Sequence, residues 1–307
     1  MARRHGATIG RRAALALAGA AALWLAADLA HSRLVAWRLG RWETAHARDA
    51  DGVQVGEAAY TVGEGDVALL LVHGLGDSPR GWDRIAPRLA EAGFTCRVMR
   101  LPGFAEPIDA QARVAKEDWI GAVAFEAAEL RRDHDRVAIV AHSLGGSVAI
   151  ATVLEGRAEI DALVLLAPLI EVSDRRSPLL PARTWHRIVR RITPFTRVTE
   201  SPFPIDARDP AERDDPERFP FTHVAVFDEL FELLDGIRAR AGELTVPLMT
   251  VTSPHDRVTD PAATARFHEA AGSAVKVRAE AVEGGHAMLR DHGWERLASE
   301  IGRFARR

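Results

Sequence analysis

Apolar positions in this chain form two patterns, short unbroken runs and longer stripes at helical spacing. Runs without polar alternation are typical of strands buried on both faces of a parallel sheet. We predict strands at Leu69–Val72, Thr95–Leu101, Val137–Ala141, Ala162–Ala167, Leu248–Val251 and Val275–Val282, preceded by a leading pair of strands within Val53–Thr61. Helical stripes lie between them, at Trp82–Ala92, Glu117–Arg132 and Ser147–Leu154. This alternation predicts an α/β protein with a doubly wound, mostly parallel sheet.

Residues 171–245 interrupt the alternation. A first amphipathic helix is predicted from apolar residues at i, i+3, i+4 and i+7, namely Trp185, Ile188, Val189 and Ile192, with arginines on its other face at Arg183, Arg187, Arg190 and Arg191. A polar stretch, Asp206–Arg218, is predicted to be a solvated loop, and a second helix carries Phe227, Leu230, Phe231, Leu234 and Ile237. We therefore predict a core built from residues 53–170 and 246–307, with a helical cap inserted at 171–245.

Residues 1–40 form a separate N-terminal segment. Its apolar run, Ala13–Ala30, is broken only by Asp28 and follows four arginines. Eighteen residues of helix measure about 27 Å, close to a hydrocarbon core of ~30 Å. We expect an uncleaved hydrophobic helix that anchors the protein in a membrane, although a cleaved export signal and an amphipathic or disordered leader are alternatives. Upstream arginines favour a cytoplasmic N-terminus and an extracytoplasmic (periplasmic) body, with an exported soluble form as the alternative.

The amino-acid composition argues against several classes of function. A net charge of −3 argues against a nucleic-acid-binding protein. Cys96 is the single cysteine, so neither an intrachain disulfide nor a thiolate metal cluster can form, and we expect it to be a small core residue. Neither closely spaced histidine ligands nor carboxylate clusters indicate a metal, and no cofactor is expected.

The richest motif is the hexapeptide from Ala141 to Gly146, which contains Ser143. It lies between a predicted strand and a predicted helix, and small residues at its ends permit a sharp turn. Such a turn exposes a serine hydroxyl, which becomes a nucleophile when a base removes its proton. We predict that Ser143 is the nucleophile.

Three further loops follow predicted strands, where open α/β sheets place their ligands. In the first, His73-Gly74-Leu75-Gly76, the N–H of Leu75 could join that of Leu144 as an oxyanion donor, and we expect His73 to brace the loop. The other two carry Asp256 and His286. We predict His286 as the base and Asp256 as the acid that orients it. Asp260 and His292 are the rival acid and base.

The chain resembles the α/β-hydrolase superfamily over about residues 53–305. The resemblance rests on the motifs described above and on the segments 69–104, 137–150, 246–261 and 282–289. Within the superfamily, the chain resembles carboxylesterases and monoacylglycerol-lipase-like enzymes. The resemblance implies Ser143, Asp256 and His286 as a catalytic triad, in the expected chain order. It also implies Leu75 and Leu144 as oxyanion donors. One departure is Ala141, where glycine is commoner. By the same resemblance, dehalogenases and epoxide hydrolases need an aspartate where Ser143 stands, so the sequence argues against these two activities.

These features predict a serine hydrolase that cleaves carboxylic esters, either small-molecule or lipid-derived, in the manner of a carboxylesterase, monoacylglycerol lipase or lysophospholipase. A thioesterase, an amidase and a carbon–carbon bond hydrolase remain open, because the fold alone does not select the reaction. A non-catalytic module that binds a hydrophobic ligand is a further alternative. The arginine-rich helix either covers the active site with its apolar stripe or lies on anionic lipid.

Overall fold

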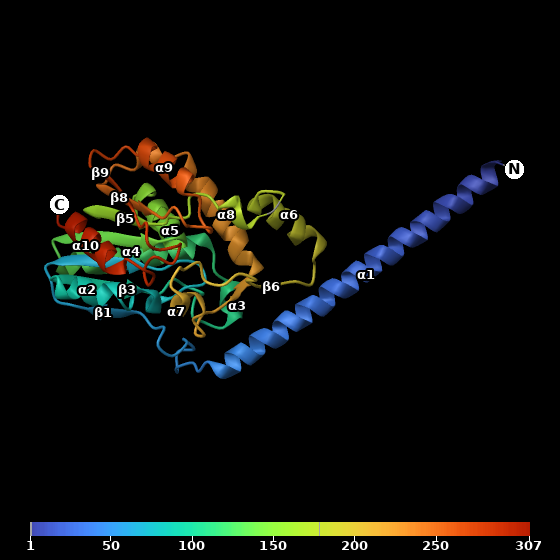
Figure 1. Cartoon of the computed structure of the whole chain (residues 1–307), viewed down its shortest axis with the longest axis horizontal. Helices are drawn as coiled ribbons and strands as arrows, with labels where there is room; N and C mark the ends of the chain where they lie inside the picture. Colours follow the sequence, from blue (N-terminus) through green and yellow to red (C-terminus); the bar gives the residue numbers. More distant parts are fainter. Residues whose placement is uncertain (1, 178) are drawn as a thin grey trace.

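A seven-stranded sheet occupies the centre of the protein in a computed structural model, which describes residues 2–177 and 179–307, with side chains from residue 12 onward (Figure 1). Its strand order is β1-β3-β2-β4-β5-β8-β9, and every neighbouring pair is parallel except β1 with β3. The strands are β1 (Tyr60–Val62), β2 (Val67–Val72), β3 (Phe94–Met99), β4 (Arg136–His142), β5 (Ala162–Leu166), β8 (Leu248–Thr252) and β9 (Lys276–Glu280). The doubly wound, mostly parallel sheet of an α/β-hydrolase fold is thus confirmed.

Helices cover both faces of this sheet. One face carries α4 (Lys116–Asp133), α5 (Leu144–Leu154), α8 (Val224–Arg238) and α9 (Pro261–Ala270), and the other carries α2 (Ile85–Glu91) and α10 (Trp294–Ala305). Successive side chains of a strand point to opposite faces, so Leu70 and Val72 join the first core while Leu69 and Leu71 join the second. Both cores are apolar and include large buried aromatic side chains, Trp119 in the first and Trp82 in the second, and this packing holds the carboxyl ends of the strands in fixed positions.

Between β5 and β8 the chain leaves the sheet. This excursion contains η2 (Asp174–Arg176), α6 (Ala182–Ile192), β6 (Val198–Glu200), α7 (Pro210–Arg213), β7 (Phe221–His223), α8 and η3 (Ala241–Glu243). Strands β6 and β7 pair antiparallel in a sheet of their own. We call this excursion the cap. Besides the helices that we expected, it contains the small antiparallel sheet of β6 and β7, which we did not predict.

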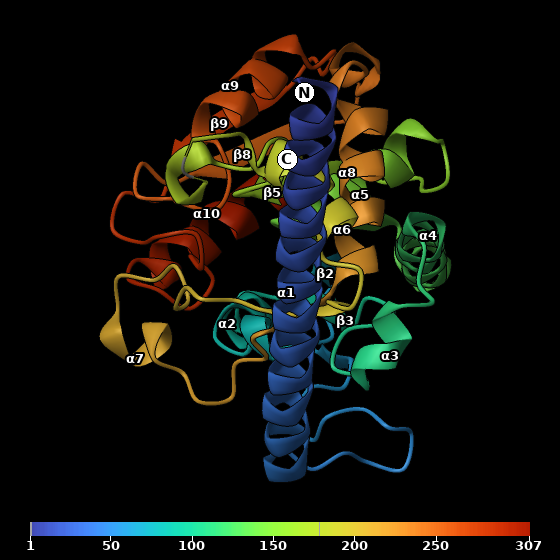
Figure 2. The ribbon, with the colours of Figure 1, turned by 90° about the vertical axis from the view of Figure 1, so that its right-hand side faces the viewer.

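Helix α1 (Ala2–Ala45) leaves the body of the protein, and its N-terminal half projects freely (Figure 1 and Figure 2). Its C-terminal half is docked: Val35 and Leu39 are buried against Ile108, in α3 (Ile108–Gln111), and against Phe221. By length and composition, α1 is able to cross a membrane, a property that it shares with a signal sequence.

Two expectations for local structure are wrong, and one helix is shorter than expected. The leading pair of strands in Val53–Thr61 reduces to β1, with only an isolated bridge from Gln54 to Arg48. The helix expected at Trp82–Ala92 is present as α2, which begins at Ile85 after the short helix η1 (Pro79–Trp82). The stretch Asp206–Arg218 is no solvated loop, because it contains α7, buries Glu212, and pairs Asp215 with Arg80.

The orientation of α6 also differs from the expected one. Arg183 pairs with Asp235 and Arg190 with Asp228, so two of the four arginines turn toward α8 instead of toward water. Val189 and Ile192 remain 37% and 43% exposed. The apolar stripe therefore does not close over the sheet, because ion pairs hold the opposite face of the helix against α8.

Candidate active site

Ser143 occupies the sharp turn between β4 and α5, as predicted. Its backbone φ of +53° and ψ of −120° are unusual for a residue with a side chain. The turn is held because Ser143 N donates to Leu166 O at 3.0 Å, and Ser143 O accepts from Leu169 N at 3.0 Å. This conformation directs the hydroxyl away from both the strand and the helix.

The side chains of Ser143, His286 and Asp256 form a continuous hydrogen-bonded row. His286 Nε2 lies 2.9 Å from Ser143 Oγ, and His286 Nδ1 lies 2.8 Å from Asp256 Oδ2. Asp256 is 1% exposed and also accepts from Val258 N, Thr259 N and Thr259 Oγ1 at 2.7 to 2.9 Å. Burial favours the neutral acid, but the neighbouring His286 and these donors outweigh it and lower the Asp256 pKa to about 2. Asp256 is therefore an anion at neutral pH.

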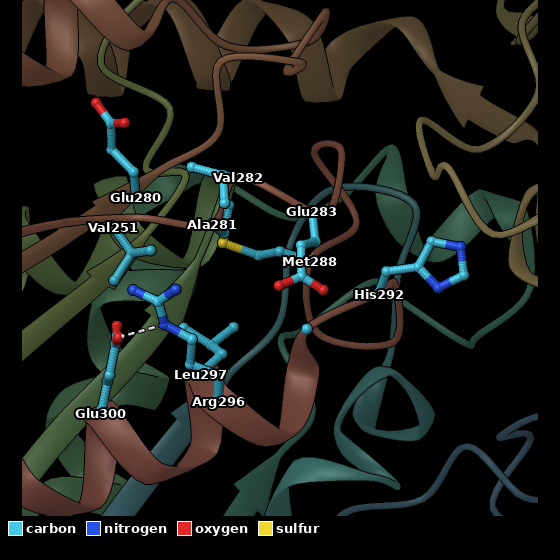
Figure 3. Close-up of a pocket in the computed structure, with 11 residues that line it drawn as sticks. Val251, Glu280, Ala281, Val282, Glu283, Met288, His292, Arg296, Leu297 and Glu300 are labelled. Atoms are coloured by element: carbon cyan, nitrogen blue, oxygen red, sulfur yellow. Dashed lines mark hydrogen bonds and ion pairs between the residues drawn. The ribbon is translucent and has the colours of Figure 1, made fainter.

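The rival residues lie elsewhere. Asp260 caps the N-terminus of α9, where its carboxylate accepts from Ala262 N at 2.9 Å. His292 is exposed and lines a small depression beside α10, together with Met288 and Arg296 (Figure 3). In the described chain, neither rival residue contacts Ser143.

The loop after β2 lies directly against Ser143. Gly74 is required here, since a Cβ at that position would lie 2.9 Å from Ser143 Cβ. Within residues 2–177 and 179–307, the N–H groups of Leu75 and Leu144 donate to no protein acceptor. Two free N–H groups beside a serine hydroxyl have the chemistry of an oxyanion site.

His73 braces this loop, as predicted. Its Nδ1 lies 2.9 Å from Gly74 O, and its Nε2 accepts from Leu101 N at 3.0 Å. Burial, the largest effect, lowers the His73 pKa to about 4. The ring is therefore neutral and links the β2 loop to the chain after β3.

His142 is a site residue that sequence reasoning missed. Its Nε2 donates to the main-chain oxygen of His286 at 2.9 Å, and the two ring centroids are 4.9 Å apart. Burial, followed in importance by the charge of His286, lowers the His142 pKa to about 3. The sequence did contain a signal for this residue, because His142 places an imidazole directly beside Ser143, the predicted nucleophile.

A second missed residue is Asp291, whose side chain is fully buried. Its carboxylate accepts from the backbone N–H groups of Arg208, Asp209, Gly285 and His292 at 2.6 to 2.8 Å. Asp291 thereby joins the cap to the loop that carries His286. The sequence offered no signal, since two of its partners, Arg208 and Asp209, lie in the stretch that we expected to be solvated.

A cavity of about 540 Å³ opens over Ser143, between the sheet and the cap. Apolar residues from the chain after β5 and from α8 line it, namely Leu169, Val172, Phe227, Leu230 and Phe231. Its lining also includes the polar residues Gln54, Glu57, Ser78, Arg80 and Arg218. Burial raises the pKa of Glu57 to about 7. The cavity thus suits a ligand with one apolar and one polar end.

A family model described as "Serine aminopeptidase, S33" matches residues 63–293. The match covers most of the chain and includes the loops that carry Ser143, Asp256 and His286. The chain therefore belongs to this family of α/β-hydrolases. The suspected resemblance is confirmed at the level of the superfamily.

Similar proteins include esterases and lipases. A pimeloyl-(acyl-carrier protein) methyl ester esterase from Klebsiella pneumoniae is 33% identical over 110 residues, covering 35% of this chain and 38% of that relative. The chain therefore spans well under half of that relative's length. Among solved structures, monoacylglycerol lipase from Paleococcus ferrophilus superposes with a TM-score of 0.67 at 19% identity, covering 80% of this chain and 97% of that one.

The monoglyceride lipase of Saccharomyces cerevisiae, in complex with a substrate analogue, superposes with a TM-score of 0.70 at 15% identity. The match covers 80% of this chain and 90% of that one. At such identities, the likeness to solved structures demonstrates the shared α/β-hydrolase fold.

Proposed function

We propose that this protein is a serine hydrolase of carboxylic esters, with Ser143 as nucleophile, His286 as general base and Asp256 as the acid that orients it. The observation that carries the proposal is the unbroken hydrogen-bonded row from Asp256 through His286 to Ser143. A hydroxyl, an imidazole and a buried carboxylate in that order form the arrangement that activates a serine.

The reaction follows from this row of contacts. Ser143 Oγ attacks the ester carbonyl carbon while His286 Nε2 takes the hydroxyl proton. The N–H groups of Leu75 and Leu144 stabilise the oxyanion of the tetrahedral intermediate. His286 then gives its proton to the departing alkoxide, which leaves as the alcohol, and Ser143 remains acylated. Water, deprotonated by His286, attacks the acyl-enzyme. The carboxylic acid is released when the bond to Ser143 Oγ breaks, and His286 returns the proton to Ser143 Oγ.

The cavity supports a lipid-derived ester as substrate. Aliphatic and aromatic side chains from α8 contribute to its lining and would hold an acyl chain, while polar lining residues such as Glu57 and Arg80 would hold a hydrophilic alcohol. Ester cleavage is also the activity after which the esterase and lipase relatives are named. A monoacylglycerol or a lysophospholipid combines an apolar acyl chain with a hydrophilic alcohol in this way.

The test is covalent labelling with a fluorophosphonate, together with hydrolysis of p-nitrophenyl esters of graded chain length. We expect labelling and turnover from the unaltered protein and neither from Ser143→Ala, with a fall in turnover of at least about 10⁴-fold. Labelling of Ser143→Ala would refute the assignment. The matching thioesters and aminoacyl p-nitroanilides distinguish an esterase from a thioesterase or an amidase.

We also propose that α1 anchors the protein in a membrane, with the body on the extracytoplasmic side. The free N-terminal half of α1 and its apolar composition support this proposal. Carbonate extraction of membranes should leave the full-length chain in the pellet, with its N-terminus intact. Recovery of the full-length chain from the soluble cytosol would overturn the anchor.

A further inference from the structure

Asp28, the one acidic residue in the apolar run of α1, is 5% exposed because the cap covers it. Its Oδ2 accepts from Phe195 N at 2.8 Å, and its Oδ1 accepts from Thr196 Oγ1 at 2.5 Å. Two further bonds join the same elements: Ser32 Oγ donates to Phe195 O at 2.8 Å, and Trp24 Nε1 donates to Ile192 O at 2.5 Å. The turn after α6 is thus fastened to α1 between residues 24 and 32.

The length of α1 locates this contact relative to a membrane. The segment from Ala13 to Ala27 measures about 22 Å as a helix, which is too short for a hydrocarbon core of ~30 Å. A crossing that begins at Ala13 must therefore continue for about 20 residues, to the level of Ser32. The cap already touches α1 along residues 24–32. If α1 crosses the bilayer, the turn after α6 must meet the bilayer surface.

The side chains at this turn suit such a position. Val189, Ile192 and Phe195 are 37%, 43% and 42% exposed, and we call these three residues the cap edge. Arg187 and Arg191 belong to the same helix as Val189 and Ile192, and neither makes an ion pair with a carboxylate in the described part of the chain. The nearby Asp228, Asp235 and Glu200 are already paired with cations.

We propose that the cap edge inserts into the surface of an anionic lipid bilayer, with Arg187 and Arg191 at the phosphates. The hydrogen bonds from Phe195 and Thr196 to Asp28 hold the cap edge at the level of the bilayer surface. Exposed apolar side chains beside unneutralised arginines are the pattern of interfacial helices. The Asp28 bonds also satisfy a carboxylate that would be costly to leave unpaired near hydrocarbon. His186, on the same helix, lines the cavity above Ser143, so α6 separates the bilayer surface from the candidate active site.

The proposal rests on the anchor but not on the esterase activity, and it is tested in the full-length protein by the depth of a fluorophore. Ile192→Cys is labelled with an environment-sensitive dye; the native Cys96 is buried and stays unmodified. Val275→Cys, similarly exposed at 43% beside β9 and far from α1 (Figure 1), is the matched control. Both variants are reconstituted in vesicles of equal parts phosphatidylcholine and phosphatidylglycerol that carry lipid-borne quenchers.

We expect quenching and a blue shift for the dye at position 192 and neither at position 275. Arg187→Glu with Arg191→Glu should abolish the quenching at 192, whereas Arg303→Glu with Arg307→Glu, the same spacing on the opposite side of the body, should preserve it. Asp28→Ala should weaken the quenching while the chain stays in the membrane. Solvent-like emission at 192 in a chain that resists carbonate extraction would overturn the proposal, without affecting the anchor or the esterase activity. Unchanged quenching in Asp28→Ala would overturn the role of Asp28.

Discussion

His142 donates a hydrogen bond from Nε2 to the main-chain carbonyl oxygen of His286, at 2.9 Å. The residue next to the candidate nucleophile therefore holds the backbone of the candidate base. Because burial lowers the His142 pKa to about 3, its ring is neutral and its Nε2 keeps the proton that makes this bond. A neutral ring also adds no repulsive charge when His286 takes up a proton in the mechanism that we propose.

Replacement of His142 by phenylalanine should therefore displace His286 without removing any reacting group. We expect kcat to fall about 10- to 100-fold, since small displacements of a catalytic group have effects of this size, while KM changes little. His142→Gln, whose amide can donate at a similar reach, should recover much of the loss. A folded His142→Phe variant with unaltered kcat in ester hydrolysis would show that the bond has no positioning role.

Gly145 is the point at which α5 meets β2. A Cβ there would lie 2.4 Å from His73 O and 2.8 Å from Val72 O, both backbone atoms that cannot give way cheaply. Gly145→Ala should therefore separate the helix from the strand and lower the stability by about 2–4 kcal/mol, as overpacking of a core does. Thermal or urea unfolding measures the loss.

The matched control is Gly236→Ala, within α8, where a Cβ meets nothing within 4 Å. Since alanine is the better helix former, this variant should be more stable by about 0.5–1 kcal/mol. Similar stabilities for the two alanine variants would contradict the packing argument.

Much of the core and the candidate site could be predicted from the sequence, because the signals there are local. Unbroken apolar runs such as Leu69–Val72 are buried on both faces, and the loops after parallel strands reach one edge of the sheet. Ser143, Asp256 and His286 each follow a strand, and they meet within hydrogen-bonding distance.

The cap was harder to predict, because its contacts are long-range ion pairs and hydrogen bonds that leave no periodic trace. The helical stripe of α6 is real, but its orientation depends on Asp228 and Asp235, some 40 to 50 residues away. The docked half of α1 did have a signal. Val35 and Leu39 repeat at helical spacing, but the apolar run before them dominated the interpretation.

Asp291 joins the cap to the loop that carries His286 through four backbone N–H groups. Asp291→Ala would leave these buried donors without an acceptor, at a cost of about 1–3 kcal/mol for each donor that water cannot reach. We therefore expect a lower melting temperature and a loss of ester hydrolysis together. Asp133→Ala, on the exposed end of α4, should change the stability by less than about 0.5 kcal/mol. Equal melting temperatures for the two variants would remove Asp291 from this role.

Glu57 gives the stability of the protein a pH dependence. Burial, reinforced by the neighbouring Asp77, Asp215 and Glu217, raises the Glu57 pKa from 4.5 to about 7, against the opposing effect of Arg80. When a carboxyl has a higher pKa in the folded chain than in the unfolded chain, the folded state binds more protons between these two values. Stability due to Glu57 is thus fully present below about pH 4.5 and is lost as the pH rises toward 7.

Glu57→Gln removes this titration and keeps the shape of the side chain. Its melting temperature should therefore rise relative to that of the unaltered protein between about pH 4.5 and pH 7, and the difference should stay constant above that range. The accumulated gain should be about 2 kcal/mol, after allowance for partial solvent screening. Melting curves measured at half-unit steps from pH 4.5 to pH 8 test this expectation. A difference that does not vary with pH would mean that Glu57 ionises alike in the folded and unfolded chain.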